Sequence, residues 1–143
     1  MLLYVKQTIT SFAEEVPATH AHLSDVRRAI GAWLRAQGVV SQTAVGDVEM
    51  VVSELGANVV DHTGSRTIRI ALELSGDRVV IDVVNRGSAY LVPAIEEWGE
   101  LVEGSRGRGL RIIRALCAEI VVSGDTEHTH IRCDVVCADA ALD

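Results

Sequence analysis

The sequence predicts an α/β fold in which a mixed, largely antiparallel sheet is covered on one face by three helices, as a two-layer sandwich. Apolar residues recur at spacings of three and four in three segments, they alternate with other residues in later segments, and glycine turns join those later segments in pairs. A helix with one apolar stripe needs a sheet to cover. Because the 143 residues contain no Pro/Gly/Ser-rich linker, residues 1–143 are expected to form a single domain.

The first elements are a strand and a helix. Residues 1–6 lack the basic start and small-residue cleavage site of a signal peptide and are predicted to form a strand. A helix is predicted over about residues 18–37, ending at Gly38. Its apolar stripe consists of Leu23, Val26, Ile30 and Trp33.

A second helix gives the strongest periodic signal in the chain. Ser41 or Thr43 can cap its start, and Gly64 ends it. The residues at helical spacing are Val45, Val48, Val52, Leu55 and Val59.

Two hairpins and a third helix follow. Residues 67–74 and 79–84 alternate around the turn Ser75-Gly76-Asp77, and residues 120–122 and 129–135 flank the turn Ser123-Gly124-Asp125. Between the hairpins, residues 88–106 are predicted to be a long loop with a turn of helix near residues 95–98, and a short helix is predicted from Gly109. Tyr90 and Trp98 lie in this loop, where they either pack locally or contact a partner.

Composition excludes several classes of protein. Acidic residues outnumber basic ones 20 to 13, and the net charge of −7 disfavours nucleic-acid binding. The longest stretch without Asp, Glu, Lys or Arg, residues 36–46, is far shorter than the roughly 20 apolar residues of a membrane span. The three cysteines have no C-x-x-C spacing, which indicates free thiols rather than disulfides or a zinc site. A cytoplasmic location is therefore expected.

Three clusters have the residue types of a ligand site. Glu54 and Asn58 are four apart on one helix face, where an amide oxygen suits Mg²⁺ and a carboxylate suits a reacting hydroxyl. Asn85-Arg86-Gly87 places a polar acceptor and a glycine at a strand end. Gly104-Ser105-Arg106-Gly107-Arg108-Gly109-Leu110 runs into a helix whose backbone N–H groups could receive phosphate oxygens. Taken alone, the first cluster is more typical of a solvated helix face and the second of a turn, while the third is as typical of a flexible helix entry as of a phosphate site.

In this order within one small domain, the clusters resemble the Bergerat-type ATP-binding family of DNA gyrase B, Hsp90, sensor histidine kinases and MutL. The chain is most similar to its short single-domain branch, the bacterial anti-sigma-factor serine kinases. The resemblance covers roughly residues 18–137, and its most specific motifs are Ser53-Glu54-Leu55-Gly56-Ala57-Asn58 and Gly107-Arg108-Gly109-Leu110.

The resemblance implies a site for ATP and Mg²⁺. Asn58 would hold the metal ion against the phosphates, and Glu54 would be the general base for the serine hydroxyl of an anti-anti-sigma (STAS-type) protein. Backbone donors to the phosphates would come from Gly107, Arg108, Gly109 and Leu110, and Arg106 would neutralise the γ-phosphate. Asn85 and Gly87 would border the adenine, with Thr129 nearby. A sigma factor would be the second partner, transcription its regulated process, and a homodimer is an assembly that the resemblance allows.

One departure from the family concerns the adenine. Where relatives have Asp in D-x-G-x-G, this chain has Asn85-Arg86-Gly87-Ser88-Ala89. The Asn oxygen could still accept a hydrogen bond from the adenine amino group, but without charge assistance, which implies a loss on the order of 1 kcal/mol. Two alternatives to an anti-sigma kinase therefore stay open: a partner-binding module with a degenerate nucleotide site, and a stress switch kinase that activates a phosphatase. A metabolic enzyme with an unrelated pocket is a fourth class.

Overall fold

The computed structural model describes residues 10–98 and 104–137. From the first helix onward, the predicted order of two helices, a hairpin, a loop, a helix and a second hairpin is confirmed. In chain order the elements are β1 (Thr10–Pro17), α1 (His20–Ala36), α2 (Gln42–His62), β2 (Thr67–Ser75), β3 (Arg78–Arg86), the 3-10 turns η1 (Ala89–Leu91) and η2 (Ile95–Glu97), α3 (Gly104–Leu116), β4 (Glu119–Gly124) and β5 (His128–Val136).

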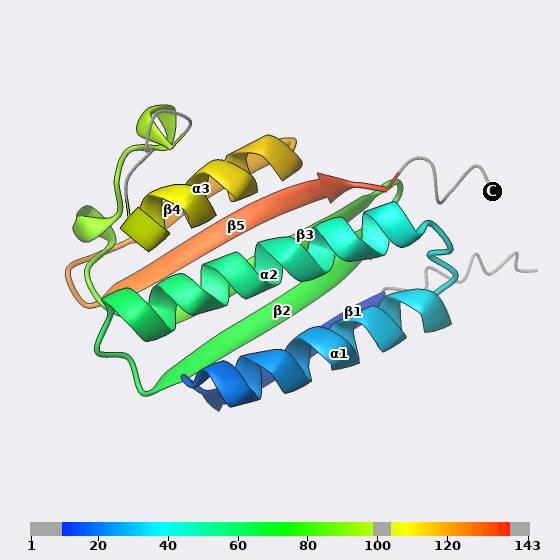
Figure 1. Cartoon of the computed structure of the whole chain (residues 1–143), viewed down its shortest axis with the longest axis horizontal. Coiled ribbons are helices and arrows are strands. Elements are labelled where there is room, and N and C mark those ends of the chain that lie inside the picture. Colours follow the sequence, from blue (N-terminus) through cyan, green and yellow to red (C-terminus); the bar gives the residue numbers. More distant parts are fainter. Residues whose placement is uncertain (1–9, 99–103, 138–143) are drawn as a thin grey trace, which may run out of the picture.

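The strands form one five-stranded sheet in the order β1-β2-β3-β5-β4. Every neighbouring pair in this order is antiparallel. Figure 1 shows α1, α2 and α3 side by side on one face of the sheet. The predicted fold class is therefore confirmed.

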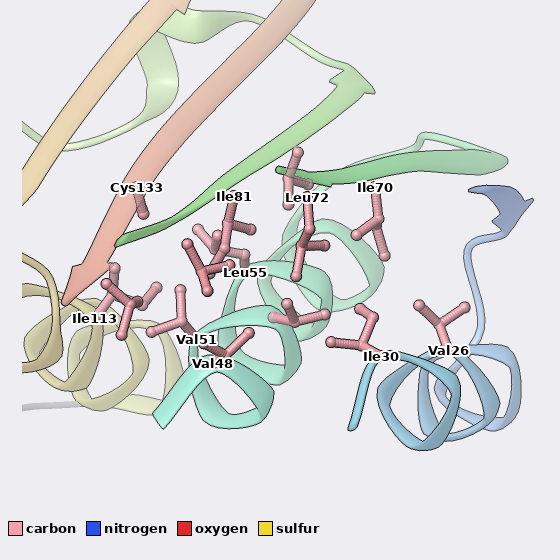
Figure 2. Packing of buried hydrophobic residues seen from close by; sticks show 14 of the residues in the cluster. Val26, Ile30, Val48, Val51, Leu55, Ile70, Leu72, Ile81, Ile113 and Cys133 are labelled. Atoms are coloured by element: carbon pink, nitrogen blue, oxygen red, sulfur yellow. The ribbon is translucent and has the colours of Figure 1, made fainter. Parts of the chain in front are cut away.

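The core lies between the sheet and the helices. Side chains such as Ile70, Leu72 and Ile81 point from the strands toward the helix layer, and Cys133 points from β5 toward the side of α3 that carries Ile113 (Figure 2). Each fully buried side chain of the larger apolar residues contributes about 1.5–3 kcal/mol to folding. Among the helices within the described ranges, none is long and apolar enough to cross a membrane.

The first strand differs from the prediction. Residues 1–6, predicted as a strand, lie outside the described residues, and β1 at Thr10–Pro17 was not predicted. Its core-facing positions include Glu14 between Phe12 and Val16, so its apolar alternation is broken. Strands at a sheet edge tolerate such charges. β1 is held at the edge of the sheet by antiparallel pairing with β2 along its whole length.

The third helix begins earlier than predicted. It starts at Gly104, whereas the sequence placed its start at Gly109. The weak periodicity of residues 88–106 predicts a loop up to Arg106, and glycine costs about 1 kcal/mol relative to alanine inside a helix. Packing against α2 overrides that local preference, because buried Gly109 lies in direct contact with the Glu54 side chain.

The segment between β3 and α3 is anchored at Trp98. The predicted helical turn corresponds to η2. The Trp98 side chain is fully buried, and its Nε1 donates to the Pro93 carbonyl at 2.9 Å. Tyr90, in contrast, is 76% exposed. Of the two aromatic residues, Trp98 therefore belongs to the core and Tyr90 to the surface.

Candidate functional site

The core-facing side of the sheet turns from apolar to polar at one end. On β3 and β5 the last core-facing residues at this end are Asn85 and Thr129, which stand opposite each other in the strand register. Both are buried, with 7% and 4% of their surface exposed. The other residues on the same face are apolar, namely Val79, Ile81 and Val83 on β3 and Ile131, Cys133 and Val135 on β5. A polar pair at this position points to a ligand site rather than to more core.

A cavity of about 180 Å³ lies at this end, between the sheet, the end of α2 and the segment after β3. Its lining residues are Leu55, Asn58, Val59, His62, Thr63, Gly64, Val83, Asn85, Gly87, Ser88, Leu91, Val92, Thr129 and Ile131. Sites that bury a whole drug-sized ligand measure about 300–1,000 Å³. The cavity therefore fits one end of a nucleotide-sized ligand, such as a base.

The side-chain amide of Asn85 has a defined orientation. Its Nδ2 donates to the Arg86 carbonyl at 2.8 Å. Because only the amide nitrogen can donate to a carbonyl, this bond assigns the two ends of the amide. In the part of the chain that the structure describes, no donor reaches Oδ1 of Asn85. This buried oxygen is an acceptor available to a ligand.

The backbone after β3 is held by hydrogen bonds from β5 and its turn. Thr129 Oγ1 donates to the Gly87 carbonyl at 2.8 Å, and Gly87 N–H donates to the Glu127 carbonyl at 2.8 Å. Gly87 has φ +138°, a conformation that residues other than glycine rarely adopt. The residues predicted around the adenine, Asn85, Gly87 and Thr129, thus share one well-braced edge of the cavity.

The turn between β4 and β5 supports the same edge. The Asp125 carboxylate accepts hydrogen bonds from the backbone N–H groups of Glu127 and His128, both at 2.8 Å. These bonds lower the pKa of Asp125 below its ordinary value. The Asp125 carbonyl in turn accepts from Ala89 N–H at 2.8 Å, which ties the start of the segment after β3 to this turn.

The other pole of the site is the contact between α2 and α3. Asn58 lines the cavity, and Glu54 lies one helical turn earlier, outside the lining. A Cβ placed on Gly109 would stand 2.6 Å from Glu54 Oε2 and 3.7 Å from Asn58 Oδ1. The structure therefore brings Glu54, Asn58 and Gly109 together, although α2 and α3 are separated in the sequence by a hairpin and a long connection.

The predicted phosphate-binding residues lie on α3. Arg106 and Gly107 belong to its first turn, Arg108 is exposed, and Leu110 is buried in the core. The N–H groups at the start of a helix have no partner within it, and α3 begins at Gly104. The donors at positions 107–110 are implied by the family resemblance, and positions 108–110 lie beyond the first turn of α3. Of the predicted backbone donors, Gly107 is thus the one that lies in the first turn.

Several lining residues are not predicted by the sequence clusters. They include Thr63 and Gly64 at the end of α2, and Leu91 and Val92 after β3. His62, which also lines the cavity, follows Asn58 by one helical turn, and this spacing predicts either a place near the site or a cap at the end of the helix. Leu91 and Val92 could not be predicted, because their place depends on how the segment after β3 folds back.

A metal ion at this site would need oxygen ligands from few residues. The described ranges contain no cluster of three or more His, Cys, Asp or Glu side chains. Mg²⁺ commonly keeps several waters and binds through one or two protein oxygens plus phosphates. The amide oxygen of Asn58, close to the contact between α2 and α3, fits that requirement.

The chain matches one protein-family model and shares its fold with solved structures. The family model described as the histidine kinase-like ATPase domain matches residues 16–134. No curated protein sequence matches the chain. The fold is similar to that of the crystal structure of the RsbU and RsbW domains of Rv1364c from Mycobacterium tuberculosis, with 21% identity and a TM-score of 0.65 over 88% of this chain and 32% of that one.

Two histidine kinase structures also match. The histidine kinase domain of the blue-light activated kinase from Erythrobacter litoralis EL346 has 21% identity and a TM-score of 0.49, over 89% of this chain and 64% of that one. The Acinetobacter baumannii histidine kinase AdeS has 14% identity and a TM-score of 0.48, over 87% and 67%. The match to the Mycobacterium tuberculosis structure spans about a third of that chain's length.

Proposed function

The chain belongs to the histidine kinase-like ATPase domain family, and from that premise we propose that it binds ATP with Mg²⁺ and acts as an anti-sigma factor with protein serine kinase activity. Its substrate would be a serine of an anti-anti-sigma protein, and its second partner a sigma factor. The observation that carries the proposal is a cavity bordered by Asn85 and Thr129 on the sheet and by Asn58 on α2.

The base end of the proposed site supports adenine binding. Oδ1 of Asn85, which no donor among the described residues reaches, can accept a hydrogen bond from an exocyclic amino group, and apolar side chains such as Val83 and Ile131 would cover the ring. A small apolar cavity with a few convergent polar atoms is typical of a ligand site.

The phosphate end lies toward the contact of α2 and α3. There the Asn58 amide oxygen would hold Mg²⁺, which when bound neutralises charge on the phosphates. Glu54 Oε2, held beside Gly109, would accept the proton of the substrate hydroxyl. The start of α3 favours negative charge through its free N–H groups and its dipole.

The sigma-factor part of the proposal rests on the motif resemblance to anti-sigma-factor serine kinases. The Mycobacterium tuberculosis structure, which contains an RsbW domain, is similar in fold to this chain. One observation favours a non-catalytic alternative: Asn85 and Ala89 replace the Asp and second Gly of the family's adenine motif. In that case the chain would bind its partners without turning ATP over.

Calorimetric titration of ATP, with and without Mg²⁺, tests the site. The wild type should bind only with Mg²⁺, and Asn58→Ala should abolish binding. The matched control is Thr43→Ala, an exposed position on the same helix outside the cavity, which should bind as the wild type does. If millimolar ATP gives no heat with the wild type, the kinase proposal fails.

A phosphorylation assay then separates the kinase from the binding module. With the cognate antagonist and labelled ATP, the wild type should transfer phosphate to serine, and Glu54→Gln should bind ATP normally but transfer little. Binding of ATP without any transfer by the wild type would favour the non-catalytic module. Recovery of a phosphatase and no sigma subunit in a pull-down would favour the stress switch kinase.

A further inference from the structure

A chain of hydrogen bonds links the end of α2 to the Asn85 edge of the cavity. Thr63 ends the helix, with its N–H and Oγ1 both donating to the Val59 carbonyl, at 3.2 and 2.6 Å. Thr63 Oγ1 also accepts from Ser65 N–H at 3.2 Å. The connection between α2 and β2 is therefore fixed up to Ser65.

The Ser65 hydroxyl is buried and uses both of its hydrogen-bonding functions. It donates to the Thr67 carbonyl at 2.7 Å and accepts from Arg86 N–H at 3.0 Å. The register of β2 with β3 stops at Ile68 opposite Asn85, so Arg86 lies one residue beyond the ladder. The Ser65 hydroxyl thus accepts the hydrogen bond of the Arg86 N–H group at a position where β2 is no longer paired with β3.

Arg86 in turn orients Asn85. Its carbonyl accepts from Asn85 Nδ2 at 2.8 Å, which leaves Oδ1 as the free end of the amide. If the amide flipped, Oδ1 would face the carbonyl oxygen of Arg86, and two acceptors would repel each other. The flip is costly while the Arg86 backbone stays in place. Ser65 holds the N–H side of Arg86, and the bond from Gly87 N–H to the Glu127 carbonyl holds the peptide group on its carbonyl side.

We propose that Ser65 is a positioning residue for base selectivity: it fixes Arg86, and Arg86 keeps the acceptor end of the Asn85 amide toward the ligand. The inference rests on the proposed function, since it concerns the same nucleotide site. A fixed acceptor selects a purine with a 6-amino group, which donates, against a purine with a 6-oxo group, which accepts. An amide that is free to flip can accept a hydrogen bond from the 6-amino group in one orientation and donate one to the 6-oxo group in the other, so it does not discriminate between the two purines.

The test compares the dissociation constants of ATP and inosine triphosphate, which differ in that group of the base. Ser65→Ala should lower the preference for ATP roughly five- to tenfold. The variant loses the hydrogen bond to Arg86 N–H, and a change of this size corresponds to the free energy of one hydrogen bond. Part of this change should be tighter binding of inosine triphosphate. Ser65→Thr keeps the hydroxyl and should restore the wild-type ratio.

Ser41→Ala is the matched control. It removes a half-buried serine hydroxyl that caps the opposite end of α2 by accepting from Ala44 N–H at 3.2 Å. It should lower stability without changing the ratio of the two dissociation constants. Equal weakening of both nucleotides by Ser65→Ala, or an unchanged ratio, would overturn the inference while leaving the proposed function intact.

Hydrogen exchange of the wild type gives a second readout that needs no variant. The Arg86 amide should exchange more slowly when ATP is bound, and inorganic triphosphate, which lacks a base, should not slow it. Equal slowing by both would contradict the inference. Failure of the wild type to bind any nucleotide would instead overturn the proposed function, and the inference with it.

Discussion

Gly109 is the residue at which two helices and two of the proposed functional side chains meet. A Cβ at this position would lie 2.6 Å from Glu54 Oε2, which is the far end of a flexible side chain. An added methyl group would therefore move the carboxylate rather than the helix. Function and stability should respond to this position in opposite directions.

Gly109→Ala should leave the protein as stable as the wild type or stabilise it by up to about 1 kcal/mol, because alanine is the better helix former. Phosphoryl transfer should fall roughly 10- to 100-fold, since the carboxylate is displaced from its place. Thermal unfolding and a phosphorylation assay measure the two effects.

Gly46→Ala is the control for Gly109→Ala. Gly46 is also helical, and a Cβ there meets nothing within 4 Å. It should raise stability by a similar amount and leave transfer unchanged. Loss of transfer in both variants, or in neither, would contradict the role assigned to the Glu54 and Gly109 contact.

Asn85→Asp tests the other pole of the site. The new carboxylate would face the Arg86 carbonyl, which now accepts from Nδ2 at 2.8 Å. Without ligand the variant should be less stable by about 1–3 kcal/mol, because a buried hydrogen bond is lost. With ATP it should bind several-fold more tightly, since a charged acceptor strengthens the bond to the amino group. Calorimetry showing weaker ATP binding would contradict this expectation.

At the scale of the elements, α1 and α2 approach each other at a glycine. A Cβ on Gly56 would lie 2.5 Å from Leu23 Cδ2 and 3.0 Å from its Cδ1, and Leu23 is itself buried in the core. The glycine within the Ser53-Glu54-Leu55-Gly56-Ala57-Asn58 motif therefore has a packing reason, separate from the chemistry of its neighbours.

Gly56→Ala should destabilise the protein by about 1 kcal/mol, because overpacking costs about 1–3 kcal/mol and the gain in helix propensity offsets part of it. Urea denaturation checks the size. In a Leu23→Ala background the same substitution should become stabilising, since the clashing methyl groups are gone. A cost that is the same in both backgrounds would mean that Leu23 is not the obstacle.

At the scale of the whole molecule, two buried thiols make stability depend on alkaline pH. The neighbouring Cys117 thiol and burial raise the pKa of the Cys133 thiol, and burial raises the pKa of Cys137. Both thiols therefore stay protonated in the folded state at pH values where the unfolded chain ionises them. Their contribution is complete below the ordinary thiol pKa of about 8.5 and is lost as the pH rises above it.

The free energy of unfolding should accordingly fall above about pH 8.5, by up to about 1.4 kcal/mol per pH unit through Cys133. Urea denaturation from pH 7 to the alkaline range measures this slope. Cys133→Ala should make the slope shallower, and an identical slope in that variant would show that other groups cause it.

Most of the fold could be predicted because each helix and hairpin has a local signature. The stripes of α1 and α2 and the two glycine turns fix these elements within a few residues. β1 and the start of α3 could not be predicted, because their structure depends on distant partners. β1 is stabilised by its pairing with β2. The first turns of α3 are stabilised by the packing of Gly109 against Glu54.

The residues of the candidate site were also partly predictable. Glu54, Asn58, Asn85 and Thr129 were singled out from the sequence and its resemblance to a family, and the structure gathers them around one end of the sheet. Ser65 could not be found in this way, because its importance lies in a hydrogen bond to Arg86, 21 residues along the chain. No spacing rule encodes such a contact.

The strand order has a consequence for the folding pathway. Each hairpin, β2 with β3 and β4 with β5, closes locally, but the pairing of β3 with β5 joins strands that are separated in the sequence by a loop, α3 and β4. Such non-local contacts form late, because a long loop must close first. Asn85 and Thr129 face each other across that very seam. The cavity therefore forms only when β3 pairs with β5, late in folding. A ligand that fills it stabilises contacts that are absent from the transition state, so it should slow unfolding more than it speeds folding.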